Sequence, residues 1–454
     1  MSLAHAHATD WNHTAAEQRA EILDQVANML ERNRYELMAL AIREGGRTLR
    51  DALSEVREAI DFCRYYAARA RADFAQAIEL PGVTGERNEL RLSGRGAFVC
   101  ISPWNFPVAI FTGQIAAALA AGNSVIAKPA GATSLTGAKI ISFMHQAGVP
   151  TEVLHFLPGG GAEIGMALVR DPRTAGVAFT GSTDTARQIN QALAQRDIII
   201  PFIAETGGQN AMIVDSSALP EQVVADALES AFDSAGQRCS ALRVLFVQED
   251  VAPRILELLS GAMEELVIGD PALINTDVGP VINDKAKAGL QQHVERMRQE
   301  ANLVKTVPLP AHCNNGSFFA PHAFEIDTLD QLSHEVFGPV LHIIRYPANQ
   351  LHNVVEAINN TRYGLTLGIH SRIDATAQYI ARHARCGNTY VNRNMIGAVV
   401  GTQPFGGEGL SGTGPKAGGP HYLHRFASER VLTINTTAVG GNASLLSIGE
   451  DDES

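Results

Sequence analysis

Cysteine is scarce in this sequence of 454 residues, and no two cysteines lie close together. The five are odd in number and form no CxxC pair; they are Cys63, Cys100, Cys239, Cys313 and Cys386. This spacing argues against a disulfide framework and against a zinc cluster, and it fits a reducing compartment. We therefore expect no bound metal and a cytoplasmic location.

The sequence also lacks long apolar runs and an excess of positive charge. No apolar stretch reaches the ~20 residues that a membrane-spanning helix needs. Residues 1–5 lack the basic start and apolar core of a signal peptide. The 36 Lys and Arg residues against 48 Asp and Glu residues give a net charge of −12, which disfavours contact with a phosphate backbone. The sequence thus predicts neither a membrane nor a nucleic-acid partner for this chain.

Two motifs that would simplify the interpretation are missing. No GxGxxG fingerprint stands at a first strand-to-helix turn, and no internal repeat of solenoid length is present. The run Pro-Gly-Gly-Gly at residues 158–161 is a weak phosphate-loop signal by itself, and a plain turn explains it equally well. A dinucleotide site must therefore be argued from other residues.

The sequence does contain an alternation of apolar strands and amphipathic helices. In the first half, strands are expected at residues 97–101, 124–127, 153–156, 176–179 and 198–200, with helices at 108–121, 134–146, 162–169 and 183–194. In the second half, strands are expected at 211–214, 242–247, 340–346, 365–370 and 389–391, with helices at 220–234, 251–266, 351–359 and 373–385. This alternation predicts an α/β fold with parallel sheets covered by helices on both faces. A chain of this length exceeds one core, so two or three domains are expected.

The regions outside this alternation predict helices and two exposed strands. Residues 14–17 (Thr-Ala-Ala-Glu) have the form of a capping box that opens a helix, Gly45-Gly46 would end a second helix, and residues 48–75 form a third. Residues 89–95 and 430–435 have strand patterns without an obvious partner in one chain. We therefore predict a homodimer or a larger assembly that pairs these strands.

Three polar side chains at strand ends or turns offer chemistry. Cys239 precedes an apolar strand in polar surroundings, where a thiol can react, although most free cysteines are small core residues. Glu205 follows an apolar strand and precedes two glycines, so it is either a general base or a surface glutamate. Asn105, in an aromatic turn, has an amide that can stabilise an oxyanion or simply the turn.

Seven motifs in order resemble the aldehyde dehydrogenase superfamily. They are Pro103-Trp104-Asn105-Phe106-Pro107, Lys128-Pro129-Ala130, Phe179-Thr180-Gly181-Ser182-Thr183, Glu205-Thr206-Gly207-Gly208, Gly236-Gln237-Arg238-Cys239, Glu335-Val336-Phe337-Gly338-Pro339 and Pro404-Phe405-Gly406-Gly407. The resemblance implies a Rossmann-type parallel sheet that binds the cofactor, an α/β catalytic domain and a small oligomerisation element. We expect the cofactor domain at residues 1–206 with oligomerisation strands at 85–96. The catalytic domain would span 207–402, and a C-terminal return and oligomerisation segment would span 403–454.

The resemblance also implies a role for each motif. Cys239 would attack the aldehyde carbon, Asn105 and the backbone N–H of Cys239 would hold the oxyanion, and Glu205 would activate the water that hydrolyses the thioester. NAD, or alternatively NADP, would accept the hydride. The residues that would hold the cofactor are Pro103, Trp104, Lys128, Gly159, Gly181, Ser182, Glu335 and Phe337.

A narrower likeness indicates the Δ1-pyrroline-5-carboxylate dehydrogenase branch, which includes a part of the bifunctional proline utilisation A proteins. It rests on Ser240 and on the runs at residues 394–401 and 411–422. The implied reaction is the oxidation of L-glutamate γ-semialdehyde to L-glutamate. Ser240, Gly397 and Ala398 would hold the substrate carboxylate, and Phe106 and Phe405 would contact its aliphatic middle. The alternatives are another carboxyl-bearing aldehyde, such as succinate semialdehyde, or a non-catalytic assembly domain with this fold.

The sequence departs from the family pattern in three ways. Gly131 stands where relatives often carry an acidic residue, which weakens the preference for NAD over NADP. Relatives have further strand and loop sequence before the first expected helix. No proline dehydrogenase portion precedes this chain, so we expect either a piece of a larger bifunctional protein or a separate enzyme for proline oxidation.

Overall fold

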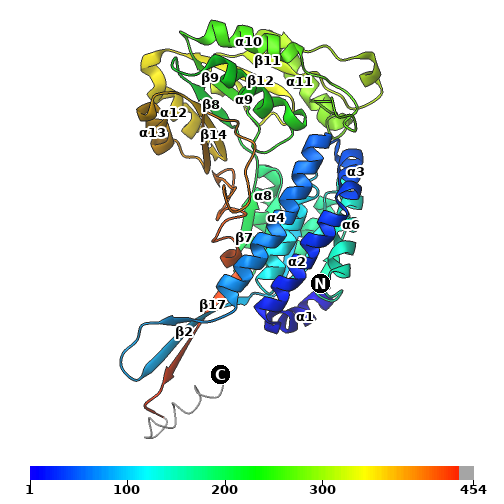
Figure 1. The fold of residues 1–454 in the computed structure, drawn as a ribbon, viewed down its shortest axis with the longest axis vertical. Coiled ribbons are helices and arrows are strands. Elements are labelled where there is room, and N and C mark those ends of the chain that lie inside the picture. The colour runs from blue at the N-terminus through cyan, green and yellow to red at the C-terminus, as the bar shows by residue number, and fades with distance from the viewer. Residues whose placement is uncertain (439–454) are drawn as a thin grey trace.

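The first four helices of the chain are drawn in blue in Figure 1, and the last three of them pack against one another as a layer. In the computed structural model, which describes residues 1–438, the four are α1 (Ser2–His13), α2 (Ala16–Arg32), α3 (Arg34–Gly45) and α4 (Leu49–Phe74). The apolar stripe of α4, which includes Val56, Ala59 and Tyr66, is buried in the core that α2 and α5 (Ala109–Ala120) share with it. Gly46 ends α3 with a φ of 66°, as the Gly-Gly pair predicts.

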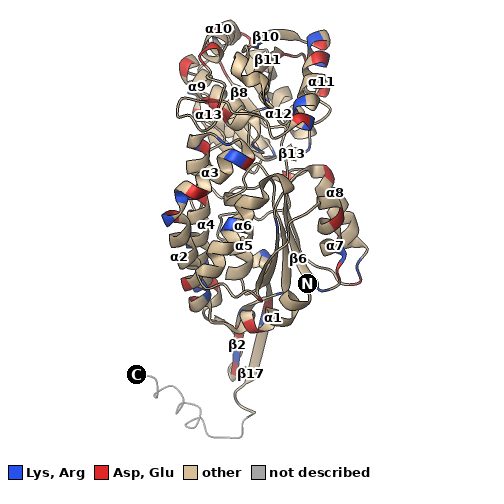
Figure 2. Ribbon diagram, turned by 90° about the vertical axis from the view of Figure 1, so that its right-hand side faces the viewer, with Lys and Arg blue, Asp and Glu red and all other residues tan. Residues whose placement is uncertain are grey.

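The first sheet is entirely parallel and has the strand order β5-β4-β3-β6-β7. Its strands are β3 (Ala97–Ile101), β4 (Ser124–Lys128), β5 (Leu154–Phe156), β6 (Thr174–Thr180) and β7 (Phe202–Glu205). Its helices are α5 (Ala109–Ala120), α6 (Ser134–Gln146), α7 (Met166–Arg170), which a short π-helix at Gly161–Gly165 precedes, and α8 (Thr183–Ala194). Figure 2 shows α5 and α6 on one face of this sheet and α7 and α8 on the other. Helices therefore cover both faces, and the continuous apolar runs of β3 and β4 are buried throughout.

The second sheet has seven strands in the order β10-β11-β12-β9-β8-β14-β15. Its strands are β8 (Ala211–Val214), β9 (Val244–Gln248), β10 (Asn302–Thr306), β11 (His322–Glu325), β12 (Val340–Tyr346), β14 (Thr366–His370) and β15 (Asn388–Val391). Its helices are α9 (Pro220–Phe232), α10 (Ala252–Glu264), α11 (Asp284–Glu300), α12 (Leu351–Asn360) and α13 (Asp374–His383). All neighbouring strands are parallel except β10 and β11. The α/β fold with parallel sheets, predicted from the alternation, is confirmed.

A three-stranded antiparallel arm projects from the body at the bottom of Figure 1. It contains β1 (Ile78–Leu80), β2 (Glu86–Gly94) and β17 (Ala427–Asn435), in the order β1-β2-β17. β2 and β17 pair along their whole length, from Gly94↔Ala427 to Glu86↔Asn435. The expectation that these two strands lack a partner within one chain is therefore wrong. A short pair, β13 (Tyr363–Gly364) and β16 (Glu408–Gly409), joins the C-terminal segment to the second sheet region.

Two local predictions are also wrong. Residues 198–200 do not form a strand, because pairing with β6 begins only at Phe202, and Ile199 is left 98% exposed. The expected capping box at residues 14–17 does not form either. Thr14 instead donates its hydroxyl to the carbonyl of Asp10 at the end of α1, a helix that the sequence pattern did not predict.

The surface and the chain end complete the architecture. Charged residues of both signs lie mainly on the outer helices, such as α2, α8 and α11, and few lie on the strands (Figure 2). Among residues 1–438, no helix is long and apolar enough to cross a membrane. Residues 439–454 of the expected C-terminal segment lie outside the described residues.

Candidate active site

Cys239 lies on a loop between α9 and β9 whose backbone is unusual. Three consecutive residues, Ser234, Ala235 and Gly236, have φ values of 58°, 54° and 67°. Residues other than glycine rarely adopt this left-handed backbone conformation. The turn that leads to Cys239 is therefore held in place by its surroundings. Gly236 also passes close to the loop before β12, because a Cβ there would lie 2.2 Å from the carbonyl oxygen of Gly338. Only glycine fits this close approach.

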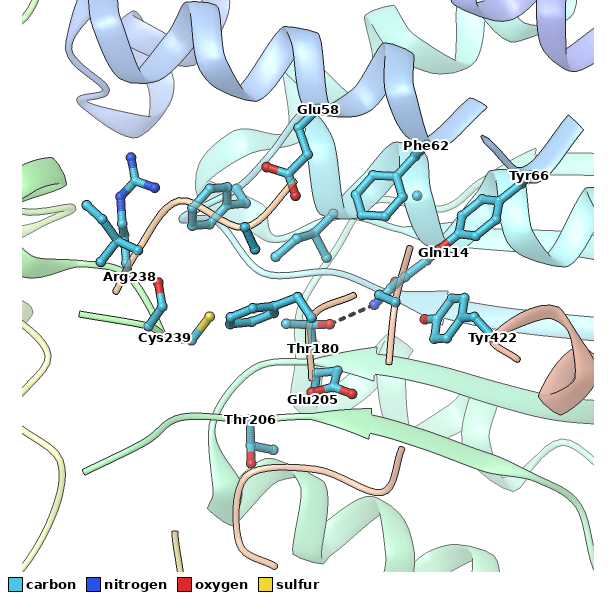
Figure 3. Close-up of a pocket in the computed structure, with 18 residues that line it drawn as sticks. Glu58, Phe62, Tyr66, Gln114, Thr180, Glu205, Thr206, Arg238, Cys239 and Tyr422 are labelled. Carbon is cyan, nitrogen blue, oxygen red and sulfur yellow. Dashed lines mark hydrogen bonds between the residues drawn. The ribbon is translucent and has the colours of Figure 1, made fainter. Parts of the chain in front are cut away.

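The Cys239 thiol faces a pocket that also contains Glu205 (Figure 3). The pocket has a volume of about 90 Å³ and is partly open to solvent. Half of its 18 lining residues are aromatic or aliphatic, and eight have polar side chains that come from both halves of the chain. The pocket therefore lies where the two sheets meet, and neither half of the chain contains it alone.

Asn105 connects the loop after β3 to the nucleophile loop. Its side-chain nitrogen donates a hydrogen bond of 3.0 Å to the carbonyl of Gln237, two residues before Cys239. An amide nitrogen carries two N–H groups, so one of them is left for an oxyanion beside the thiol. Asn105 thus lies against the loop that carries Cys239, although it is not among the residues that line the pocket, and its role as an oxyanion donor stays a prediction.

Glu205 ends β7 and points toward the glycines of the C-terminal segment. Its Oε2 accepts a hydrogen bond of 3.2 Å from the Gly407 N–H, and its buried Oε1 has no partner among the described residues. Burial raises the pKa of this carboxyl to about 8, although the Gly407 N–H and Lys416 act in the opposite direction. A carboxyl with a pKa near the operating pH can take a proton from water or from a thiol.

The resting Cys239 is a thiol and not a thiolate. Burial raises its pKa to about 12, and the nearby carboxylates of Glu335 and Glu205 add to this shift. Arg238 opposes the shift only weakly, because it forms ion pairs with Asp51 at 2.5 Å and Asp233 at 2.7 Å. A base must therefore take the thiol proton before or during attack.

The expected cofactor residues of the first sheet gather at the carboxyl ends of its strands. Pro103 and Trp104 follow β3, Lys128 ends β4, Gly159 follows β5, and Gly181 and Ser182 follow β6. Carboxyl ends of parallel strands meet at one edge, where such sheets bind ligands. Ser182 also caps α8 by accepting from the Thr185 N–H at 3.3 Å.

Glu335 and Phe337 reach this edge from the loop before β12. The Phe337 ring meets Trp104 edge to face, with ring centres 5.8 Å apart. Glu335 pairs with Arg243 at 2.9 Å, and a Cβ on Gly207 would lie 1.8 Å from its Oε2. The two sheets thus contribute to one continuous site beside the Cys239 loop.

The residues at the edge fit a dinucleotide. The buried Lys128 ammonium donates to the Pro129 carbonyl at 2.9 Å, which needs only one of its three N–H groups. Gly131, Gly160 and Gly161 have no heavy atom within 4 Å of the position where a Cβ would stand, so a ligand can approach their backbone closely. An acidic acceptor for a ribose 2′-hydroxyl is absent at Gly131.

Four of the five expected substrate-binding residues line the pocket, and one does not. Phe106, Ser240, Ala398 and Phe405 belong to the lining, whereas Gly397 lies outside it, exposed beside Arg393. Five polar lining residues had no predicted role in the site, and they are Glu58 on α4, Gln114 on α5, Thr180 at the end of β6, Thr206 and Arg238. Glu58 stands in an ordinary amphipathic helix pattern, so no local signal marks it.

Comparisons with known proteins agree with this geometry. A profile of the Aldehyde dehydrogenase family matches residues 1–432. The "Bifunctional protein PutA" of Klebsiella aerogenes is 51% identical over 433 residues, which cover 93% of this chain and 32% of that protein. The "1-pyrroline-5-carboxylate dehydrogenase" of Geobacillus thermodenitrificans is 38% identical over 419 residues, which cover 91% of this chain and 80% of that protein.

Solved structures give the same result. A crystal structure of a Bradyrhizobium japonicum proline utilization A mutant has a TM-score of 0.94 and 56% identity, covering 97% of this chain and 45% of that one. A structure of 1-pyrroline-5-carboxylate dehydrogenase from Thermus with bound NAD has a TM-score of 0.91 and 36% identity, covering 95% and 84%. The chain thus spans about a third of the length of the PutA relatives in sequence, and most of the length of the single-function dehydrogenases.

Proposed function

We propose, from the fact that this chain belongs to the aldehyde dehydrogenase family, that it oxidises L-glutamate γ-semialdehyde to L-glutamate with NAD, the second step of proline catabolism. The observation that carries this proposal is the pocket that places Cys239, Glu205 and Ser240 together with Glu58. The 38% identity to a 1-pyrroline-5-carboxylate dehydrogenase over most of that protein's length supports the same reaction.

The chain's own residues account for the acyl-transfer steps. A base removes the Cys239 proton, the sulfur bonds to the aldehyde carbon, and Asn105 donates to the oxygen that becomes negative. NAD, when bound, would supply the acceptor for the hydride that leaves the aldehyde carbon as the thioester forms. Glu205 then takes a proton from water, the water oxygen attacks the thioester carbon, and the Cys239 sulfur leaves. Lys128, Gly181, Ser182, Glu335 and the residues beside them would hold the cofactor.

The polar groups of the pocket suit both charged groups of this substrate. L-glutamate γ-semialdehyde carries a carboxylate and an ammonium group at the end opposite its aldehyde. The Ser240 hydroxyl and the backbone at Ala398 are suitable donors to the carboxylate. Burial raises the pKa of Glu58 to about 7, with a further contribution from Glu55. A substrate ammonium would favour the ionised carboxylate, so Glu58 complements the second charge.

Two other functions and one other cofactor are the alternatives to this proposal. Succinate semialdehyde shares the carboxylate but has no ammonium group to pair with Glu58, so the pocket favours the amino acid. A non-catalytic assembly domain would not need the Cys239 thiol and the Glu205 carboxyl to meet in one pocket. NADP is an alternative cofactor, because Gly131 supplies no acidic side chain.

Steady-state kinetics with purified protein test the substrate. We expect kcat/KM for L-glutamate γ-semialdehyde to exceed that for succinate semialdehyde and for pentanal. In Glu58→Gln this advantage over succinate semialdehyde should fall by about 10-fold or more, because a charge-assisted contact is lost. Equal kcat/KM values for all three aldehydes in the unmodified protein would remove the substrate assignment.

The nucleophile is tested separately. Cys239→Ala should abolish NADH formation while NAD binding, followed by protein fluorescence, persists. Cys313→Ala is the matched control, because Cys313 is buried in the core of the second half of the chain. Normal turnover by Cys239→Ala would contradict the thiol mechanism.

The wider context of the chain is part of the proposal. The PutA relatives are named as bifunctional proteins, and this chain matches about a third of their length. A proline dehydrogenase module in the same protein or as a partner would supply the substrate. A homo-oligomer is supported by the projecting arm, whose strand β17 leaves one edge without a neighbour in the described part of the chain.

A further inference from the structure

We propose that five buried charged residues beside α4 set the position of the oxyanion donor relative to the nucleophile. This buried charge cluster comprises Arg47, Asp51, Glu55, Asp233 and Arg238. Apart from Arg238, which also borders the pocket, the cluster acts on the thiol and on the oxyanion donor only through other residues. Its members are therefore positioning residues. The proposal rests on the thiol chemistry of the proposed function.

One side of the cluster holds the loop that carries Asn105. Glu55 is 1% exposed, and its Oε1 accepts hydrogen bonds from the N–H groups of Val108 at 2.6 Å and Ala109 at 3.3 Å. These N–H groups open α5, only three and four residues after Asn105. A carboxylate at a helix N-terminus is favoured by the helix dipole, so Glu55 fixes where the Asn105 loop enters α5.

The other side of the cluster holds the loop that carries Cys239. Arg238 reaches Asp51 on α4 at 2.5 Å and Asp233 at 2.7 Å. Arg47, which is 3.3 Å from Glu55, donates a hydrogen bond to the hydroxyl of Ser234. Ser234 is one of the left-handed residues in the turn before Cys239. The cluster therefore connects the turn at residues 234–236 and the loop that carries Asn105 to the same two turns of α4.

The Phe106 ring connects the cluster to the pocket. The guanidinium carbons of Arg47 and Arg238 lie 4.6 and 5.3 Å from the centre of this ring, which lines the pocket. Both cations thus pack against the residue that follows Asn105. A shift of either arginine would move a wall of the pocket and the neighbouring amide together.

The composition of the cluster does not favour a role in stability alone. Two cations face three carboxyl groups in a buried space, and several of their polar atoms make no hydrogen bond within residues 1–438, among them Arg238 Nε and Asp51 Oδ2. Buried charges pay a large desolvation penalty, and incompletely bonded networks add little net stability. Charges held at defined distances do, however, specify geometry, which is what the two loops require.

A double-mutant cycle with L-glutamate γ-semialdehyde tests the link between the cluster and Asn105. Glu55→Gln should lower kcat/KM on the order of 10- to 100-fold, because small misplacement of a catalytic group is costly. In an Asn105→Ala background the same change should lower kcat/KM by no more than about twofold. Equal losses in both backgrounds, or no loss in the first, would overturn the proposal. Glu31→Gln is the matched control, because Glu31 pairs with Arg64 of α4 on the surface.

A second measurement does not depend on the aldehyde. The rate at which iodoacetamide alkylates Cys239 at fixed pH reports the placement of the thiol. We expect Asp51→Asn to change this rate by about threefold or more, while Glu31→Gln leaves it unchanged. The proposal would be overturned if Asp51→Asn left the alkylation rate unchanged. It would also be overturned if the surface control Glu31→Gln changed the rate as much as Asp51→Asn does. If Asp51→Asn fails to fold, Asp51→Glu takes its place with the same expected outcome. This variant keeps the charge but displaces the carboxyl group.

The two measurements separate this inference from the proposed function. If the unmodified protein does not turn over L-glutamate γ-semialdehyde, the substrate assignment fails. The alkylation rates then decide the role of the cluster by themselves.

Discussion

At the scale of single residues, burial is the main influence on the chemistry of the site. It raises the pKa of Cys239 to about 12 and that of Glu205 to about 8. The thiol therefore resists unwanted oxidation and alkylation at neutral pH, since the thiolate is the reactive form. The cost of this arrangement is that a base must act, and Glu205 lines the same pocket.

The raised pKa of Glu205 predicts how thioester hydrolysis depends on pH. A carboxyl whose pKa is raised keeps its proton up to higher pH, and only the deprotonated form can accept a proton from water. Hydrolysis should therefore slow as the pH falls below about 8 and reach a plateau above it. Stopped-flow measurement of the step after the first NADH is formed, between pH 6 and 10, provides the check.

Variants identify the group responsible for this pH dependence. Glu205→Gln should slow hydrolysis by about 10²- to 10⁴-fold and remove the transition near pH 8. Glu408→Gln, an exposed glutamate on the neighbouring segment, should behave as the unmodified protein. A flat profile in the unmodified protein would contradict the role of Glu205.

At the scale of elements, the turn between α9 and β9 is the most constrained segment of the site. It contains three consecutive left-handed residues, and Gly236 approaches the backbone of Gly338 closely. The Gly338 loop also carries Glu335 and Phe337, so the nucleophile turn packs directly against a loop that is expected to hold the cofactor.

Two glycine substitutions distinguish this turn from ordinary helix positions. Gly236→Ala should destabilise the protein and lower kcat/KM, because its Cβ would meet a backbone oxygen at 2.2 Å and its φ is 67°. Gly261→Ala, on α10 in open space, should raise the free energy of unfolding by about 0.5 to 1 kcal/mol without a change in activity. Chemical denaturation combined with kinetics measures both effects. Full activity in Gly236→Ala would contradict the constraint.

At the scale of the whole molecule, the site depends on the two halves of the chain being held together. Asn105 and Glu205 come from the first half, and Cys239 and Ser240 come from the second. The C-terminal segment then returns to the first half, where Thr413 donates its N–H to the Ala204 carbonyl at 3.0 Å and the Gly407 N–H meets Glu205. The arm leaves the body at the opposite end from the second sheet (Figure 1).

The arm predicts the state of assembly. β17 is an edge strand whose Val431 and Leu432 are 61% and 50% exposed. Exposed apolar edges pair with other chains, and a charge on such an edge blocks pairing. We expect a dimer or larger assembly by light scattering at micromolar concentration, and a lower mass for the double variant Val431→Lys, Leu432→Lys.

A control on another edge tests the specificity of this effect. Leu303 is 49% exposed on β10, the edge strand of the second sheet. Leu303→Lys should leave the mass unchanged. A monomeric mass for the unmodified protein would contradict the assembly.

Much of the fold follows from local sequence. The apolar runs placed β3, β4, β8 and β12 correctly, because strands buried on both faces need continuous apolar residues. The strand predicted at residues 198–200 does not form, because an apolar run becomes a strand only where a neighbouring strand can pair with it. α1 was missed because few of its residues, such as Ala4 and Trp11, are buried.

The sequence by itself determined which residues stand at strand ends and, through its motifs, the family and the identities of Cys239, Glu205 and Asn105. The tertiary structure alone decided what these residues touch. The Asn105 bond to Gln237, the Glu205 bond to Gly407 and the pairing of β2 with β17 each join residues more than 100 positions apart. The same holds for Glu58 and the buried charge cluster, whose helix shows only an ordinary amphipathic pattern. Spacing and periodicity record local conformation, whereas burial and charge pairing arise only when distant segments pack together.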